Sequence, residues 1–154
     1  MSNSGAATQE VRNLVARASR AYMGSLAVRD GTAFPFVSLV LPGLDAAGRP
    51  LLLLSDLSDH AKNLKINPKA SLLYDGTLDL KEPLAGPRVT LIGEVVLADD
   101  AENRKLYLAR QPSAEMYAGF GDFRLYRFEI AEALFVAGFG RIHRLGPDDG
   151  LVVR

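Results

Sequence analysis

The sequence predicts a mainly β fold of the α+β class, in which an antiparallel β barrel is flanked by helices. Short apolar segments bounded by turn residues outnumber the helical segments, and the two kinds do not alternate strictly along the chain. This order favours an antiparallel barrel over a doubly wound parallel sheet. Asp30 and Gly31 form a strong signal for a tight hairpin turn, which joins antiparallel strands. The common nucleotide-binding and hydrolase signatures GxGxxG, GxxxxGK and GxSxG are absent from the sequence.

Length and composition indicate one globular domain. The chain has 154 residues, of which 48% are hydrophobic and 23% are charged, as is ordinary for a folded domain with a real core. We expect a single domain over 1–154, with flexible tails at 1–7 and 146–154. The formal net charge is zero, so the composition shows no electrostatic footprint for nucleic acid.

Residue types exclude several other classes of protein. The sequence has no cysteine, which rules out disulfides and cysteine-ligated metals, and its two histidines are too few for a histidine-rich metal site. The first residues, MSNSGAATQE, lack the charged and apolar regions of a signal peptide. No apolar run approaches the ~20 residues of a membrane span. We therefore expect a soluble cytoplasmic protein without a metal site and without a membrane or nucleic-acid partner.

The first half of the chain begins with a predicted helix that Thr8 caps and Gly24 ends, because apolar residues recur between them at helical spacing. Two strands then flank the hairpin turn, and a polar turn over 45–50 precedes the next strand. Apolar runs bounded by turn residues predict strands at 25–29, 34–41, 51–54, 70–74, 88–98 and 123–130, the last of which continues over 132–136.

The second half of the chain opens with a surface loop at 76–86, which is rich in charged and turn-forming residues. Gly93 lies inside the strand that follows and suggests a bulge or a bend. Asp99 is the predicted cap of a helix that ends near Arg110, and a short helix and loop over 113–120 come next. The weak apolar stripe of the longer helix consists of Leu106, Leu108 and Ala109.

The segment 51–75 predicts a binding site, because a strand, a capped helix and a second strand follow one another in it. Ser58 is a good N-cap for a helix over 59–66, since its side-chain oxygen can accept from amide groups of the first turn. The positive end of the helix dipole at a strand exit is a ready anion site, with His60 and Lys62 within reach. The functional interpretation is a phosphate pocket for a cofactor. The alternative is a solvated connecting helix with an ordinary cap.

Polar residues elsewhere also have open interpretations. Ser38 is the lone hydroxyl in an apolar run, and it either bonds to backbone or lines a ligand groove. Arg88 is either a solvated strand end or a residue that faces the same pocket as Ser58. Arg141 and His143 point to one side if their segment is a strand.

The order of five motifs resembles the FMN-binding split-barrel superfamily related to pyridoxamine 5′-phosphate oxidase, and in particular its haem-utilisation branch. The resemblance covers roughly residues 11–145, and it implies a six-stranded antiparallel split β-barrel with Greek-key topology, flanked by helices. No single motif is decisive, whereas five in this order are specific. The motifs are FPFVSLV, LSDHAKNLKINPKASLL, PRVTLIGEV, YAGFGDFRLYRFE and GFGRIHRL.

By this resemblance the protein is a homodimer that binds two FMN molecules at the subunit interface. The helix that starts at Ser58 would receive the FMN phosphate, and Arg88 would stabilise the reduced, anionic flavin. Arg141 and His143 match the R-x-H on the substrate side of the flavin in the oxidases. The implied cofactor-binding residues are Phe36, Val37, Ser38, Ser55, Asp56, Leu57, Ser58, His60, Lys62, Asn63 and Arg88.

The sequence departs from the oxidases at two places. Asp59 and His60 stand where the oxidases have a basic pair, so Lys62 is the nearest firm cation and phosphate binding is predicted to be weaker. Asp59 would repel phosphate, so we expect it to face solvent. Pro42 stands about where the oxidases carry the basic residue that grips pyridoxal phosphate, so pyridoxamine 5′-phosphate oxidase activity itself is not expected.

The leading functional prediction is an FMN-dependent oxidoreductase of unknown substrate, in which the flavin accepts the hydride and no catalytic side chain is assigned. The first alternative is a haem-binding or haem-degrading protein on the same barrel. It would need an axial ligand, and His143 is the better candidate because His60 is assigned to the phosphate end. The second alternative is a cofactor-free dimeric binding module, which follows if Asp59 and the missing basic pair abolish FMN affinity.

Overall fold

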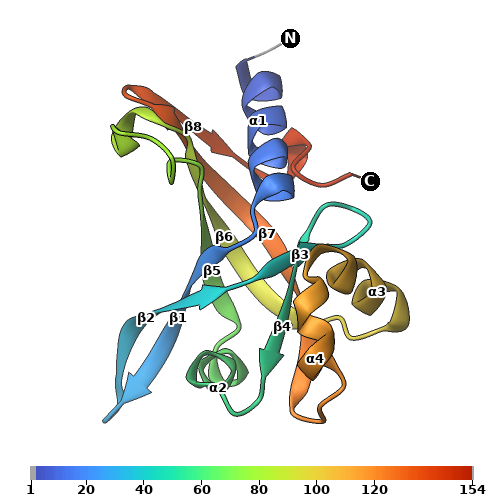
Figure 1. Cartoon of the computed structure of the whole chain (residues 1–154). Helices are drawn as coiled ribbons and strands as arrows, with labels where there is room; N and C mark the ends of the chain where they lie inside the picture. The colour runs from blue at the N-terminus through green and yellow to red at the C-terminus, as the bar shows by residue number, and fades with distance from the viewer. Residues whose placement is uncertain (1–2, 154) are drawn as a thin grey trace.

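The computed structural model describes residues 3–153 (Figure 1). Among these residues, every helix is too short or too polar to span a bilayer. The helices are α1 (Asn3–Arg17), α2 (Asp59–Ile66), α3 (Ala101–Arg110) and α4 (Glu115–Ala118), with 3-10 turns at 83–85, 112–114 and 147–149. The strands are β1 (Ala21–Arg29), β2 (Thr32–Val40), β3 (Pro42–Leu44), β4 (Pro50–Ser55), β5 (Lys69–Asp75), β6 (Arg88–Leu97), β7 (Phe123–Gly138) and β8 (Arg141–Leu145).

All strands belong to one antiparallel sheet with the order β2-β1-β5-β6-β7-β4-β3, and β8 pairs with β7 outside this path. The sheet curls round the core but does not close, because its two end strands, β2 and β3, are not paired with each other. The predicted mainly β fold with flanking helices is confirmed. The predicted number of six strands is wrong, since residues 3–153 contain eight. The two additional strands are the short β3, which begins at Pro42, and β8 in the segment after Gly140.

Two local predictions from glycine are confirmed. Asp30 and Gly31 both have positive φ angles, 50° and 75°, as a two-residue hairpin turn between β1 and β2 requires. In the β6–β7 ladder, the register shifts next to Gly93 so that Ala131 of β7 has no partner. The predicted irregularity is therefore a β-bulge, and its extra residue lies in the strand opposite Gly93.

The N-terminal helix differs from its prediction at both ends. Thr8 is not its cap but lies within α1, where its hydroxyl donates to the carbonyl oxygen of Asp149 at 2.9 Å. Gly24 does not end the helix, because β1 already begins at Ala21 and its side chains alternate between core and surface. The Thr8 contact and the buried Leu151 hold the described part of the C-terminal segment on the core. The flexibility of the tails stays a prediction, and residues 1–2 and 154 lie outside the described residues.

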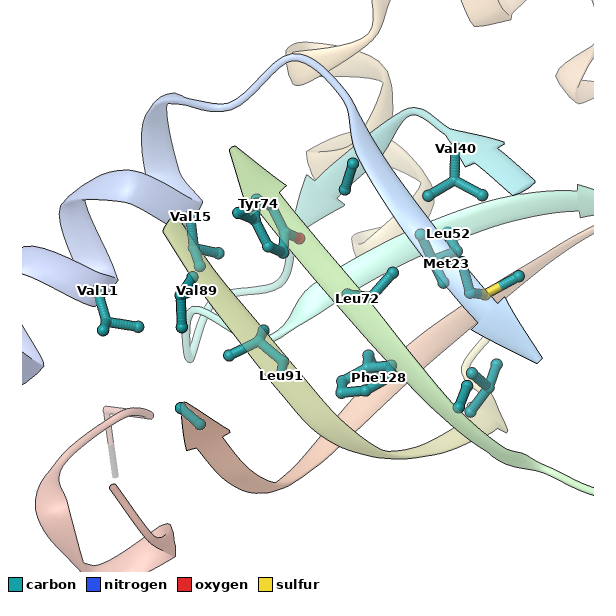
Figure 2. Packing of buried hydrophobic residues seen from close by; sticks show 14 of the residues in the cluster. Val11, Val15, Met23, Val40, Leu52, Leu72, Tyr74, Val89, Leu91 and Phe128 are labelled. Carbon is teal, nitrogen blue, oxygen red and sulfur yellow. The ribbon is translucent and has the colours of Figure 1, made fainter. Parts of the chain in front are cut away.

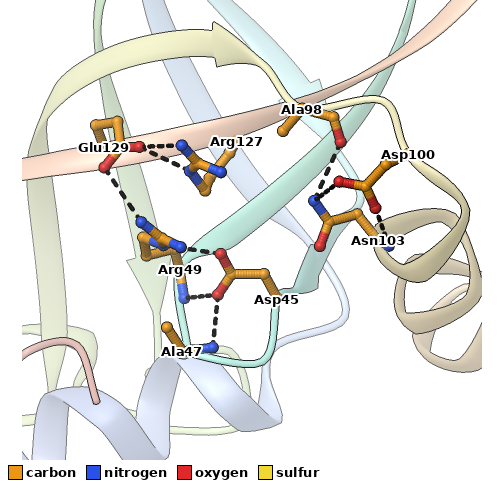
Figure 3. Close-up of polar contacts among 8 residues, drawn as sticks. All are labelled: Asp45, Ala47, Arg49, Ala98, Asp100, Asn103, Arg127 and Glu129. Atoms are coloured by element: carbon orange, nitrogen blue, oxygen red, sulfur yellow. Dashed lines mark hydrogen bonds and ion pairs between the residues drawn. The ribbon is translucent and has the colours of Figure 1, made fainter. Parts of the chain in front are cut away.

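Helix α3 has a different cap and a different buried face from those predicted. Its cap is Asp100, whose carboxylate accepts from the amide of Asn103 at 2.7 Å (Figure 3). Asp99 instead binds Arg104 of the same helix, and this pair lowers the pKa of the Asp99 carboxyl. The buried residues of α3 are Asn103 and Tyr107, whose spacing of four places them on one face. Of the predicted stripe, Leu106 and Leu108 are half-buried and pack against the same apolar cluster as Tyr107, whereas Ala109 is exposed.

The core lies between the inner face of the sheet and α1 (Figure 2). Phe128 of β7 is fully buried near its centre, and Val11 and Val15 of α1 cover one end. The outer face of the sheet is different, because Val37 and Leu39 of β2 are 71% and 60% exposed. A large apolar sheet face is therefore left uncovered in the single chain.

A charged network fixes the polar turn that precedes β4 (Figure 3). The carboxylate of Asp45 accepts from the amides of Ala47 and Arg49 and from the Arg49 guanidinium. Arg49 also lies 3.7 Å from Glu129 of β7, which pairs with Arg127. The predicted turn over 45–50 is thereby tied to the long strand beside β4.

Candidate functional site

The candidate site is a groove at the seam where the sheet fails to close. Leu41 alone separates β2 from β3, and β3 pairs with β4 whereas β2 does not. A groove with a volume of about 230 Å³ lies between these strands and the first turn of α2. Its lining residues are Leu39, Val40, Leu41, Leu52, Leu53, Leu54, Ser55, Ser58, His60, Tyr107, Tyr117 and Phe123.

The walls of the groove are apolar and aromatic. Tyr107 of α3 is 2% exposed, and its hydroxyl donates to the carbonyl oxygen of Leu41 at 2.7 Å, so it ties α3 to the chain between β2 and β3. Burial raises the pKa of the Tyr107 hydroxyl, which keeps the phenol neutral. The ring of Tyr117 packs against Phe123 with the ring centroids 4.8 Å apart. These contacts hold one side of the groove in place.

The polar end of the groove is the start of α2. The Ser58 hydroxyl accepts from the amide of Ala61 at 3.3 Å, as predicted for the cap, and donates to the carbonyl oxygen of Ser55 at 2.6 Å. One turn further along α2, the buried side-chain amide of Asn63 donates to the Ser25 hydroxyl at 3.2 Å. This hydrogen bond anchors α2 on β1. His60 projects from this anchored turn into the groove and is half-buried.

The protonation of His60 is set mainly by its burial. Removal from water lowers the pKa of the imidazole below its usual value, and the neighbouring carboxylate of Asp59 opposes this shift only in part. The neutral ring is therefore favoured at pH 7. Asp59 itself is exposed, as expected.

Asp56 is an ion-pair residue at the rim. Its carboxylate lies 2.9 Å from Arg124 of β7 and 3.5 Å from Lys65 of α2. The Arg124 contact lowers the pKa of Asp56, so the carboxylate stays ionised. The neighbouring Ser55 hydroxyl donates to Asp122 at 2.6 Å. This end of β4 is thereby joined to both α2 and β7.

The structure brings together only some of the residues that the sequence assigned to cofactor binding. Ser55, Ser58 and His60 line the groove, and the adjacent strand contributes the residues just after those predicted in β2. Ser38 has a buried hydroxyl without a hydrogen-bond partner among residues 3–153. The other members lie outside the lining: Phe36 and Val37 on β2, the exposed Leu57 and Lys62, and the buried Asn63.

Arg88, Arg141 and His143 lie at the other end of the sheet from α2 (Figure 1). Arg88 donates to the carbonyl oxygens of Leu84 and Gly86, and thus holds the loop before β6. Arg141 is exposed and 3.8 Å from Glu10. Within one chain, these three residues do not face the pocket of Ser58, and any joint role would require a second subunit.

Sequence reasoning missed the aromatic side of the groove. Tyr107, Tyr117 and Phe123 come from α3, α4 and the start of β7, all distant from β4 in sequence. For Tyr107, the helical spacing from Asn103 was a usable signal. No local pattern indicated that Tyr117 and Phe123 meet the leucines of β4.

Comparisons with known proteins identify relatives. The family model described as CREG, beta-barrel matches residues 3–150. The chloroplastic heme oxygenase HOZ of Arabidopsis thaliana is 40% identical over 108 residues, which are 68% of this chain and 32% of the plant protein. The heme oxygenase HutZ of Vibrio cholerae is 28% identical over 137 residues, which are 73% of this chain and 76% of HutZ. The chain thus spans about a third of the plant relative's length.

Among solved structures, a heme binding protein from Mycobacterium smegmatis matches with a TM-score of 0.85 and 28% identity, over 94% of this chain and 60% of that one. The split-barrel fold implied by the sequence resemblance is confirmed. The FMN part of the resemblance is overturned, because these relatives are named for haem. The predictions of FMN as cofactor and of an FMN-dependent oxidoreductase were therefore wrong. The first alternative, a haem-binding or haem-degrading protein on the same barrel, agrees better with these relatives.

Proposed function

Since the chain belongs to the CREG β-barrel family, we propose that it binds haem in the groove between β2 and β4. Haem combines a flat apolar ring with two carboxylates and an iron that takes axial ligands from side chains. The observation that carries the proposal is the composition of the groove, whose walls are leucines and aromatic rings and whose polar groups gather at one end. These residues fit haem, and the names of the relatives support the same ligand.

A second subunit completes the site in this proposal. Small-molecule sites are typically about 300–1,000 Å³, and the groove of one chain is smaller, at about 230 Å³. The uncovered apolar face of the sheet begins at the same strand, because Leu39 of β2 lies in register with Tyr22 of β1 and, through it, with Leu73 of β5. We therefore propose a homodimer that buries this face and adds a further wall to the groove.

Haem titration of the purified protein tests the function. We expect a Soret band that saturates at one haem per chain. Leu53→Glu places a carboxylate in the apolar groove, and the cost of burying this charge should weaken haem binding at least ~10-fold. Leu78→Glu is the matched control, because Leu78 is exposed and outside the groove, and it should bind haem as the wild type does. Absence of saturable binding, or equal losses in both variants, would contradict the proposal.

Haem degradation is the second candidate function, favoured by the names of the two curated relatives. Haem would then be the substrate, and its oxidation would require dioxygen and electrons from a reductant. Ascorbate added in air to the loaded protein should bleach the Soret band faster than that of free haem at the same concentration. A Soret band that does not fade faster would show that the protein binds haem without degrading it.

The dimer is tested by light scattering. We expect twice the chain mass at micromolar concentration, with an interface at or above about 2,000 Å² in total. Leu39→Glu should shift the protein towards the monomer, because it places a charge on the uncovered apolar face. Wild-type protein that is monomeric under these conditions would rule out a shared site.

A further inference from the structure

We propose that the imidazole of His60 is the side chain that ligates the haem iron, an inference that rests on the haem-binding function proposed above. Iron in haem proteins is held most often by histidine, with cysteine, methionine and tyrosine as the other ligands. The sequence has no cysteine and two histidines, His60 and His143. Only His60 lies in the groove.

The position of His60 suits a ligand. It is the second residue of α2, which Ser58 caps and which the Asn63–Ser25 hydrogen bond holds on β1. No hydrogen bond or ion pair of its ring is found within residues 3–153, so the unprotonated ring nitrogen is not engaged by another residue. A half-buried side chain on a fixed turn of helix, with its ring engaged by no other residue, is available for coordination.

The tyrosines of the groove are weaker candidates. Tyrosine binds iron as the phenolate, and burial raises the pKa of Tyr107 and so opposes its ionisation. Its hydroxyl is also engaged with the carbonyl oxygen of Leu41. Tyr117 packs its ring on Phe123 and is the remaining alternative ligand within the lining.

His143 occupies a different environment. Its ring stacks on Phe135 at a centroid distance of 6.1 Å and an interplanar angle of 25°. His143 lines a crevice together with Ala6, Ala7, Gly140, Arg141 and Ile142, and this lining contains none of the leucines and aromatic rings of the groove. From the sequence alone, His143 was the better candidate only because His60 was assigned to a flavin phosphate. With FMN overturned, the structure favours His60.

Resonance Raman spectroscopy of the ferrous haem complex tests the proposal, together with haem titration. We expect an iron–histidine stretching band in the wild-type protein and its loss in His60→Ala. Haem affinity should fall at least ~10-fold. Loss of a group that only supports a metal ligand already weakens metal binding by this factor, and loss of the ligand itself should cost no less. Free imidazole should restore a nitrogen-ligated spectrum in His60→Ala, because the vacated space lies in the groove. His143→Ala is the matched control, because His143 lies outside the groove, and it should keep both the band and the affinity.

The outcomes separate this inference from the function on which it rests. Wild-type protein that fails to bind haem contradicts the haem-binding proposal itself. Haem binding with an iron–histidine band that survives in His60→Ala but disappears in His143→Ala overturns the ligand assignment alone. A wild-type spectrum without such a band that changes in Tyr117→Phe assigns the iron to Tyr117 instead. Far-ultraviolet circular dichroism checks the fold, and His60→Gln, which keeps a polar side chain of similar length, should lose the band as well.

Discussion

Gly93→Ala is expected to destabilise the folded protein strongly. A Cβ atom on Gly93 would lie 1.9 Å from the backbone oxygen of Glu129 and 3.0 Å from a ring carbon of Phe128. The first contact is with backbone in the β6–β7 ladder, which cannot move without breaking hydrogen bonds beside the bulge at Ala131. The expected cost exceeds about 4 kcal/mol, a large part of the ~5–15 kcal/mol that stabilises a typical domain.

Urea denaturation followed by circular dichroism measures this effect. Gly119→Ala is the control, because a Cβ atom there meets no other atom within 4 Å and its φ angle of −83° suits alanine. Its unfolding free energy should stay within about 0.5 kcal/mol of the wild type. If Gly93→Ala also kept its unfolding free energy within about 0.5 kcal/mol of the wild type, the two strands would have to separate easily at the bulge. Protein concentration must be kept constant, because the stability of a dimer depends on it.

The parts of the fold that the sequence predicted correctly are those that depend only on residues next to one another in the sequence. The turn at Asp30 and Gly31, the cap at Ser58 and the irregularity at Gly93 each follow from the chemistry of one or two residues. Element ends were less predictable, because tertiary pairing decides them. Tyr22 fits a helical stripe by spacing, yet it joins β1 because Leu39 and Leu73 pair with it on either side.

The candidate site divides in the same way. Ser55, Ser58 and His60 were identified because they follow one another at the exit of a strand. Tyr117 and Phe123 could not be identified, since only the packing of α4 and β7 against β4 brings them to the groove. The identity of the ligand could not be predicted either. An apolar wall beside a helix N-terminus suits a flat ring with acidic groups, and the names of the relatives favour haem among such ligands.

Phe128→Ala is expected to lower the unfolding free energy by ~3–5 kcal/mol. The ring is fully buried near the middle of the core, where side chains of β1, β5 and β6 surround it (Figure 2). Truncation removes its apolar contacts and leaves a cavity, because the strands that carry its neighbours are held by their ladders. Thermal or urea unfolding at fixed protein concentration gives the value, and a loss below about 1 kcal/mol would show that the core collapses into the space.

Two comparisons make the Phe128 result specific. Phe139→Ala removes the same ring from a position that is 73% exposed, and its effect should stay within about 0.5 kcal/mol. Excess haem should raise the stability of the wild type and of Phe128→Ala by the same amount, because a ligand stabilises the fold by mass action and Phe128 is not part of the groove lining. A smaller increment in Phe128→Ala would mean that the core behind Leu52 and Leu54 shapes the groove, so that packing and ligand binding are coupled through β4.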